Sequence, residues 1–387
     1  MPVYLPSLLM ALSQMALLIL LPLYVLDLGF SPAFAATVVG LRGVGVLLFD
    51  VPAGMLVARF GDKPVLLGGL VMILLGNGLL AIAEHPLVLA GAALLLGAGF
   101  AAWMLGRQSY IADTCENEEV GRAIAVMAGL QRVGTFIGPA AGGLLAAQAG
   151  YPLAFAAGAV IAVIAAALVL GFTINTKPEH DKIDGGLAGT GRLVLAHGKI
   201  FATAGLAALT LQLMRAARTL LIPLFGEAIG LDVAAVGLVY SASAAIDMCL
   251  FYPVGVLVDR RGRKWSAVPS MALFALGLAL LPWARDFYAL MAVGLVLGLA
   301  NGMGTGIVMI MGADLAQRTA QRGQFLGVWR LMGDVGMSAA PLLSGVLVEV
   351  ASLGAASLSA AGIGVVGLIV MLTLVPETLR RPAYRAG

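Results

Sequence analysis

The chain has 387 residues, of which 61% are apolar and 11% are charged, and its formal net charge is +3. Soluble domains carry about 25% charged residues, and long apolar runs cannot be packed in water without leaving large exposed apolar patches. This composition excludes a soluble enzyme. It also argues against a nucleic-acid partner, because the sequence holds no basic stretch interleaved with aromatic residues.

Apolar runs of about 20 residues, each long enough to cross about 30 Å of hydrocarbon as a helix, recur from end to end. One long polar stretch, residues 175–200, lies between the sixth run and the seventh. We therefore predict an all-α membrane protein with a six-helix bundle over 1–174, a cytoplasmic linker over 175–200 and a second bundle with a short tail over 201–387. The twelve predicted spans are 4–26, 34–58, 64–83, 87–110, 120–147, 152–174, 201–225, 233–258, 265–283, 287–312, 323–350 and 354–375.

The two predicted bundles repeat each other in sequence. Residues 50–63 (DVPAGMLVARFGDK) match residues 251–264 (FYPVGVLVDRRGRK) at an offset of 201, and Ala112-Asp113 matches Ala313-Asp314 at the same offset. A duplicated unit in so apolar a chain is typical of secondary transporters, whose two halves surround a central site.

The Lys and Arg residues outside the predicted helices lie almost entirely on one side. Arg285 is the exception, in a loop on the opposite side, and Arg107, near the end of the fourth helix, is expected to extend to the interface. Because cytoplasmic loops carry the excess of Lys and Arg, both termini are predicted to be cytoplasmic, in a multi-pass protein of the plasma (inner) membrane. The basic segments are 59–63, 107–122, 177–199, 260–264, 318–322 and 380–385.

Two loop segments carry a family resemblance. GMLVARFGDK (54–63) and GVLVDRRGRK (255–264) resemble the cytoplasmic-loop signature of the major facilitator superfamily, Gly-x-x-x-Asp-Arg-x-Gly-Arg-Lys. The second copy is complete, whereas the first has Ala58 in place of the Asp and Asp62 in place of the Arg. The resemblance implies a twelve-helix carrier that works by alternating access.

The same resemblance implies a charge lock between this loop and an acid at the end of the next-but-one helix. The complete set in this chain is Asp259, Arg263 and Asp314, which we predict to act in gating. The counterpart in the first half, with Asp113, is expected to be weak or to work differently because its own loop lacks the Asp.

Residues 134–143 (GTFIGPAAGG) resemble a second signature of this superfamily, the antiporter motif of helix five, Gly-x-x-x-Gly-Pro-x-x-Gly-Gly. Small residues on one face allow close helix contact, and Pro139 removes a backbone donor and bends the helix. The resemblance implies an exporter that exchanges its solute for protons, with Gly138 and Pro139 in gating. Tight packing without meaning for transport direction is the alternative.

Ionisable residues inside the predicted helices are the functional candidates, because a charge in the bilayer is costly. Bases outnumber acids there, which suits an anionic or zwitterionic solute better than a cationic drug. Asn77 is a secondary polar candidate, and Gly302-x-Gly304-x-Gly306 is interpreted as either a hinge or a packing face. The candidates are Asp50, Asp247 and Asp334 for proton coupling; Arg42, Arg215, Arg218, Gln14, Gln212 and Asn301 for the substrate cavity; and Arg132 and Arg330 for gating.

Two of these acids are predicted to meet bases of the other half. In the superfamily, helix two packs near helix eleven and helix five near helix eight. At 1.5 Å per residue, Asp50 then lies level with Arg330, and Arg132 level with Asp247. We predict that both pairs approach contact in one access state and separate in the other; a latch between Arg330 and Asp334 on one helix face is the alternative for that arginine.

The sequence therefore predicts proton-coupled export of a small amphipathic or anionic organic solute by a monomeric carrier. Uptake or facilitated diffusion of a small metabolite is one alternative, and a non-transporting receptor or scaffold is another. The expected partners are the solute, protons and the lipid bilayer. No catalytic residue, cofactor or metal site is expected, because His85, His180 and His197 lie far apart in loops.

Overall fold

The computed structural model describes residues 2–115, 117–176, 186–317, 319 and 321–378. The basic residues Lys177, Lys182, Arg318, Arg380, Arg381 and Arg385, used above to predict orientation, lie outside this part of the chain. Helices long and apolar enough to cross a membrane number 12 among the described residues. This count agrees with the predicted spans.

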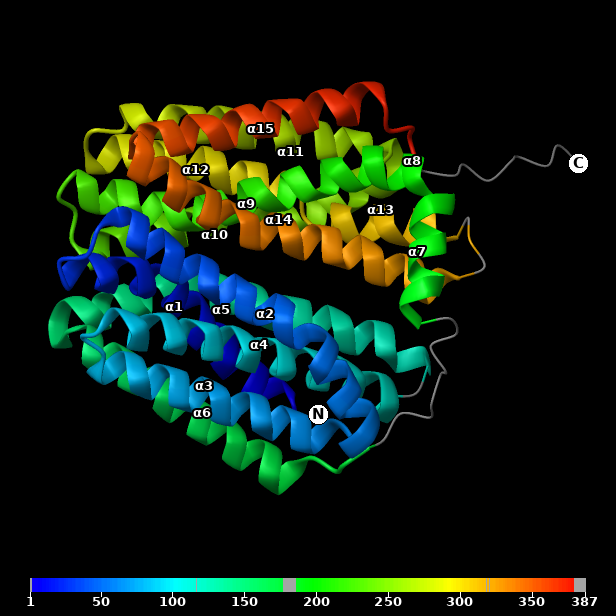
Figure 1. Ribbon diagram of the computed structural model, residues 1–387, viewed down its shortest axis with the longest axis horizontal. Coiled ribbons are helices and arrows are strands. Elements are labelled where there is room, and N and C mark those ends of the chain that lie inside the picture. Colours follow the sequence, from blue (N-terminus) through cyan, green and yellow to red (C-terminus); the bar gives the residue numbers. More distant parts are fainter. Residues whose placement is uncertain (1, 116, 177–185, 318, 320, 379–387) are drawn as a thin grey trace, which may run out of the picture.

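The helices form two groups that lie side by side with their axes roughly aligned (Figure 1). Along the chain, the two groups are connected by α7 (Gly186–Ala196), α8 (Gly198–Ile200) and a π-helical turn at Phe201–Gly205. The first group contains α1 (Tyr4–Asp27), α2 (Pro32–Phe60), α3 (Asp62–Ile82), α4 (Pro86–Thr114), α5 (Asn117–Ala149) and α6 (Tyr151–Phe172). The second contains α9 (Leu206–Ala228), α10 (Val233–Arg261), α11 (Lys264–Leu280), a 3-10 turn (Leu281–Trp283), α12 (Phe287–Met303), α13 (Ile307–Ala316), α14 (Arg322–Val350) and α15 (Leu353–Thr373).

Part of the segment predicted as a polar linker is helical. Residues Gly186–Ala196 form α7 at the end of the molecule where the chain crosses between the halves (Figure 1). Leu193 of this helix is 2% exposed and belongs to the apolar core of the second half. Leu193 thus docks the linker helix against the second bundle, whereas Leu195 is exposed.

We call the end that carries α7 the linker end, and the opposite end the distal end. Helices α2 and α10 start at the distal end, and each begins at a side-chain cap that satisfies a first-turn amide. Ser31 accepts from the Phe34 amide at 3.2 Å before α2, and Asp232 accepts from the Ala235 amide at 2.7 Å before α10. At the linker end the same two helices stop at Gly61 and Gly262, whose φ angles of +89° and +111° suit glycine.

The turn at each of these glycines is held by a clamp that occurs once in each half. In the first half, Asn175 Oδ1 accepts from the Lys63 amide at 3.2 Å, and Lys63 Nζ donates to the Thr173 carbonyl at 2.8 Å. In the second, Glu377 accepts from the Lys264 amide at 3.1 Å, and Lys264 Nζ donates to the Leu372 carbonyl at 3.0 Å. The end of the last helix of each bundle is thereby fastened to the start of its third helix.

The two halves meet along α2 with α14 and along α5 with α10, as predicted. The backbones approach most closely toward the distal end, where glycine leaves no room for a side chain. A Cβ on Gly237 would lie 2.6 Å from the Pro139 carbonyl oxygen, and one on Gly43 would lie 3.2 Å from the Ser338 Cβ. By contrast, Gly54 and Gly327, nearer the linker end of α2 and α14, have no heavy atom within 4 Å of a Cβ position. This conformation is therefore closed at the distal end.

Candidate transport site

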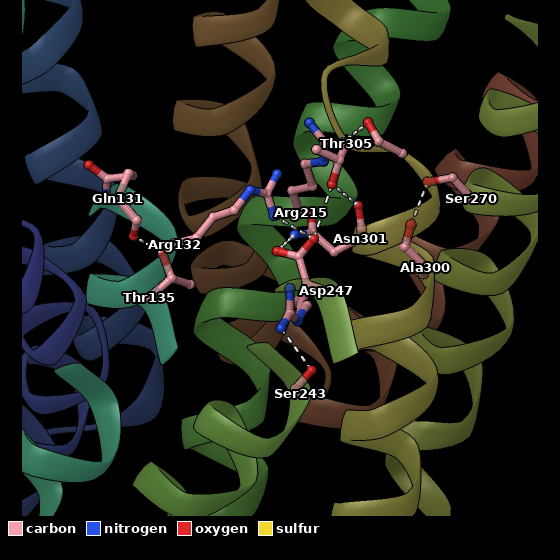
Figure 2. Close-up of polar contacts among 12 residues, drawn as sticks. Gln131, Arg132, Thr135, Arg215, Ser243, Asp247, Ser270, Ala300, Asn301 and Thr305 are labelled. Atoms are coloured by element: carbon pink, nitrogen blue, oxygen red, sulfur yellow. Dashed lines mark hydrogen bonds and ion pairs between the residues drawn. The ribbon is translucent and has the colours of Figure 1, made fainter. Parts of the chain in front are cut away.

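A polar network centred on Asp247 joins both halves at mid-depth (Figure 2). Asn301 Nδ2 donates to Asp247 Oδ2 at 2.9 Å, and Thr305 Oγ1 donates to Oδ1 at 3.0 Å. Arg132 of the first half places Nη1 3.3 Å from Oδ1, and its guanidinium lies over the Phe251 ring. The side chains of Arg132 and Asp247 are 17% and 10% exposed, so this ion pair is largely withdrawn from solvent. The predicted Asp247–Arg132 contact is confirmed.

A break in the tenth membrane span supplies part of this network. The prediction of a continuous helix over 287–312 is wrong at Gly304–Gly306, which separate α12 from α13, with Gly306 at φ +70°. A broken span exposes backbone carbonyls that need donors in a membrane. Three such carbonyls are paired: Ser270 Oγ donates to Ala300 at 2.7 Å, Arg215 Nη2 donates to Gly304 at 2.5 Å, and Ser266 Oγ donates to Met303.

Arg215 and Arg218 of α9 bring two more cations to the same region. Arg215 Nη1 donates to Gln212 Oε1 at 2.7 Å, and Arg218 Nη2 donates to Ser243 Oγ at 2.7 Å. The guanidinium of Arg218 also lies over the Tyr240 ring, 5.0 Å from its centre. The Nε atoms of both arginines are buried and have no partner among the described residues. Both guanidiniums therefore donate hydrogen bonds to neutral acceptors, and neither contacts a carboxylate in the described structure.

Arg330 bridges two acids between α2 and α14. Its Nη2 lies 3.7 Å from Asp50 Oδ2 in the other half, and its Nε lies 3.6 Å from Asp334 Oδ2 on its own helix. The predicted inter-half pair and its alternative, the latch on one helix, are thus present together. The side chain of Arg330 is 44% exposed, so this pair is far less enclosed than the one at Asp247.

The remaining cavity candidates of the first half lie apart from the Asp247 network. Arg42 Nη2 donates to Gln14 Oε1 at 2.7 Å, and its guanidinium lies 5.4 Å from the centre of the Phe100 ring. Arg107 is 7% exposed and donates to Met104 Sδ. The expectation that Arg107 extends to the interface is wrong, because α4 continues for two more turns to Thr114 and leaves it inside the bundle.

The predicted loop lock is present in part. Arg263 Nε donates to Asp314 Oδ2 at 2.8 Å, and Thr378 Oγ1 donates to the same oxygen at 3.0 Å. Asp259 is exposed and pairs with none of the described residues, so its expected place in this cluster is wrong for this conformation: the last turn of α10 buries Val258 and turns Asp259 outward. In the first half, Asp113 accepts a long bond of 3.5 Å from Ser109.

The glycine-rich stretch of α5 packs against two helices. A Cβ on Gly138 would lie 2.6 Å from the Leu12 carbonyl oxygen of α1, and one on Gly142 would lie 2.6 Å from the Ala16 Cβ. One residue after Pro139, the Ala140 amide donates to Ser241 Oγ of α10 at 3.0 Å. The predicted close packing is confirmed, and the motif also forms part of the contact between the halves.

Several residues of the site were not found by sequence reasoning. Thr305 and Ser243 are short polar residues whose partners are set by the fold, although the glycines at 302, 304 and 306 did mark the break beside Thr305. Glu377 stands 202 residues after Asn175, so a longer comparison of the two repeats would have revealed the paired clamps.

A membrane protein of two similar six-helix halves, joined by mid-depth ion pairs and closed at one end, has the architecture of an alternating-access carrier. The family model for the Major Facilitator Superfamily matches residues 3–214 and again residues 204–386. The chain belongs to this superfamily and is a multi-pass transporter of it.

Individual relatives are distant. The Multidrug resistance protein MdtH of Aeromonas hydrophila is 25% identical over 342 residues, which cover 85% of this chain and 82% of that protein. The MFS-type transporter ppzB of Metarhizium rileyi is 30% identical over 139 residues, which cover 36% of this chain and 28% of that protein. A solved POT family transporter in complex with 5-aminolevulinic acid superposes with a TM-score of 0.76 at 11% identity, covering 96% of this chain and 94% of that one. This last likeness concerns the fold alone.

Proposed function

We propose that this protein exports a small amphipathic or anionic organic solute in exchange for protons. The observation that carries the proposal is the charge of the central network: Arg132, Arg215 and Arg218 surround one carboxylate, that of Asp247, among the described residues. Uncompensated charge is expensive at membrane depth, so such a site favours a solute that brings negative charge.

Two further observations support export with proton exchange. The motif at 134–143 resembles that of proton-exchanging exporters, and its glycines and Pro139 lie at the contact between the halves. The curated relatives that match over most of their length are named multidrug resistance proteins. The orientation follows the Lys/Arg distribution, with the linker end in the cytoplasm, so the conformation closed at the distal end faces inward.

The proton-coupling candidates are the acids that hold arginines between or beside the halves. Protonating Asp50 removes its attraction to Arg330 across the interface, and protonating Asp247 does the same for Arg132. Loss of either attraction frees the halves to rock, which links proton binding to the change of access. Asp50 is the first choice, because Arg330 is its sole described partner and that pair is the more exposed of the two.

The test is solute flux in proteoliposomes with an imposed pH gradient. A panel of small organic acids, zwitterions and amines should show transport of acids or zwitterions, driven by a proton gradient of opposite direction. Asp50→Asn should abolish the pH-driven flux and leave exchange of solute for solute. Flux that is independent of pH, or confined to amines, would contradict the proposal.

The orientation is tested by labelling intact cells with an impermeant maleimide, in a background free of native cysteines. If the linker end is cytoplasmic, the reagent should label Arg285→Cys and leave Lys199→Cys unlabelled.

A further inference from the structure

A second pocket lies wholly inside the first half, away from the Asp247 network. It has a cavity volume of about 210 Å³ and lies between α1, α3, α5 and α6. This volume is below the roughly 300–1,000 Å³ of sites that enclose drug-sized molecules, and it suits a slender alkyl chain. The lining is almost entirely apolar and contains no charged side chain.

The pocket has one polar spot, made by Ser13 of α1 and Asn77 of α3. Asn77 is 2% exposed and donates through Nδ2 to the Ile73 carbonyl at 2.9 Å, but its Oδ1 accepts no hydrogen bond from the described residues. Ser13 is 7% exposed and also has no partner in the described part of the chain. Neither Asn77 Oδ1 nor Ser13 Oγ is among the fully buried unpaired atoms of the described residues, so both oxygens can be reached from the pocket. A molecule in so apolar a pocket gains by pairing its own polar group with these oxygens.

Gly158 of α6 keeps this polar spot open. A Cβ on Gly158 would lie 2.8 Å from Asn77 Oδ1 and 3.2 Å from Ser13 Oγ, so both oxygens point at the space that the missing side chain leaves. The other wall is α5, where Gly138 and Gly142 of the antiporter-like motif line the pocket. Ile137, also in the lining, is 43% exposed, so the mouth opens at the outer surface of membrane-spanning helices.

We propose that this pocket binds a single-tailed amphiphile with one hydroxyl group, drawn from the bilayer. The uncharged lining accommodates an alkyl body, and the hydroxyl of the amphiphile donates to Asn77 Oδ1 and accepts from Ser13 Oγ. A charged head group is disfavoured, because nothing in the lining would compensate its charge. Two walls of the pocket are α1 and α5, and α5 contacts α10 of the second half through Gly143 and Pro139. An occupant of the pocket therefore packs against a helix that helps to close the distal end.

The probe is dodecanol carrying a diazirine, compared with its methyl ether, on the full chain in lipid nanodiscs. Photolabelling should concentrate on segments 137–145 and 154–161, and unlabelled dodecanol should compete. The alcohol should label about fivefold more than the ether, the size expected for one hydrogen bond. Gly158→Leu, which fills the polar end of the pocket, should remove the labelling. Gly171→Leu is the matched control on the same helix, since a Cβ there meets nothing within 4 Å.

A double variant keeps the proposal testable if Gly158→Leu does not fold. Asn77→Leu with Ser13→Ala should lower alcohol labelling to the level of the ether and leave ether labelling unchanged. Equal labelling by both probes in the parent protein, or labelling spread evenly over all helices, would overturn the proposal. Arg215→Gln should label like the parent protein even where it no longer transports, so this site and the proposed function can fail separately.

Discussion

Asp247 and Asp50 each face an arginine of the other half, but they are held very differently. Asp247 accepts from Asn301 and Thr305 in addition to its ion pair with Arg132. Asp50 faces Arg330 at 3.7 Å, and its buried Oδ1 has no partner among the described residues. The Asp247 carboxylate is thus held by several partners between the helices, whereas the Asp50–Arg330 contact can be broken at a small cost in free energy.

This difference predicts unequal effects on stability. Asp247→Asn leaves Arg132 largely buried without its counter-ion, which costs up to about 3 kcal/mol. Asp50→Asn breaks a longer pair whose arginine is 44% exposed, so its contribution approaches that of a surface pair, about 1 kcal/mol or less. Thermal unfolding of the purified variants should therefore show a clearly larger loss for Asp247→Asn. Asp259→Asn, on the same helix as Asp247 but exposed and unpaired in the described structure, is the control and should change little. Equal losses for Asp50 and Asp247 would refute the ranking.

Depth counting predicted both inter-half pairs, because helical rise is constant and the family resemblance implied which helices face each other. It could not predict which hydrogen bonds surround each acid. Arg215 donates to the Gly304 carbonyl, which lies in the break where α12 stops at Met303 and which also accepts from the Ile307 amide at 3.3 Å. The arginine appeared in the sequence as a charge without a partner, and its partner is a consequence of the break.

At the scale of helices, glycine positions decide where the halves touch. On α10, Gly237 faces the Pro139 carbonyl of α5, whereas Gly255, five turns later, faces open space. Sequence reasoning recognised the α5 glycines as a packing face from their spacing. It did not identify Gly237, since no motif marks the partner surface on α10.

Gly237→Ala should wedge the distal end open. Its Cβ would meet the Pro139 carbonyl oxygen at 2.6 Å, and backbone atoms cannot give way as a side chain can. Spin labels at Glu84 and Arg285, both exposed at the distal end, should show a longer distance in the variant, and transport should fall several-fold. Gly255→Ala is the matched control on the same helix. An unchanged label distance in Gly237→Ala would show that the closed distal end does not depend on this contact.

The paired clamps at the linker end predict local effects confined to one half each. Glu377→Ala removes the acceptor for the Arg263 and Lys264 amides at the start of α11, and Asn175→Ala removes that for the Lys63 amide in α3. Loss of a capping acceptor costs about 1 kcal/mol. Hydrogen exchange should rise at residues 263–267 in the first variant and at 62–66 in the second, each serving as the other's control. Faster exchange at both sites in either variant would mean that the clamps are not independent.

For the whole molecule, composition was sufficient for the membrane class and the number of spans, and the family resemblance supplied the helix pairs between the halves. The first two features depend on hydrophobic length, which can be read directly from the sequence. The access state is different, because a rocking carrier visits conformations of similar free energy that share every one of those features. Only the contacts identify the conformation described here as closed at the distal end.

A disulfide across the distal end should trap this conformation. A Cβ on Gly43 would lie 3.2 Å from the Ser338 Cβ, near the roughly 3.5–4.5 Å separation of a disulfide. With Cys115 and Cys249 replaced by serine, Gly43→Cys/Ser338→Cys should crosslink on oxidation and stop transport, and reduction should restore it. Gly54→Cys/Gly327→Cys is the matched pair nearer the linker ends of the same two helices, where neither position meets another atom within 4 Å. This second pair should stay reduced in the resting protein and crosslink only while solute and a proton gradient drive the cycle. If it crosslinks as readily as the first pair without solute, or if the oxidised first pair still transports, the two ends do not open in alternation.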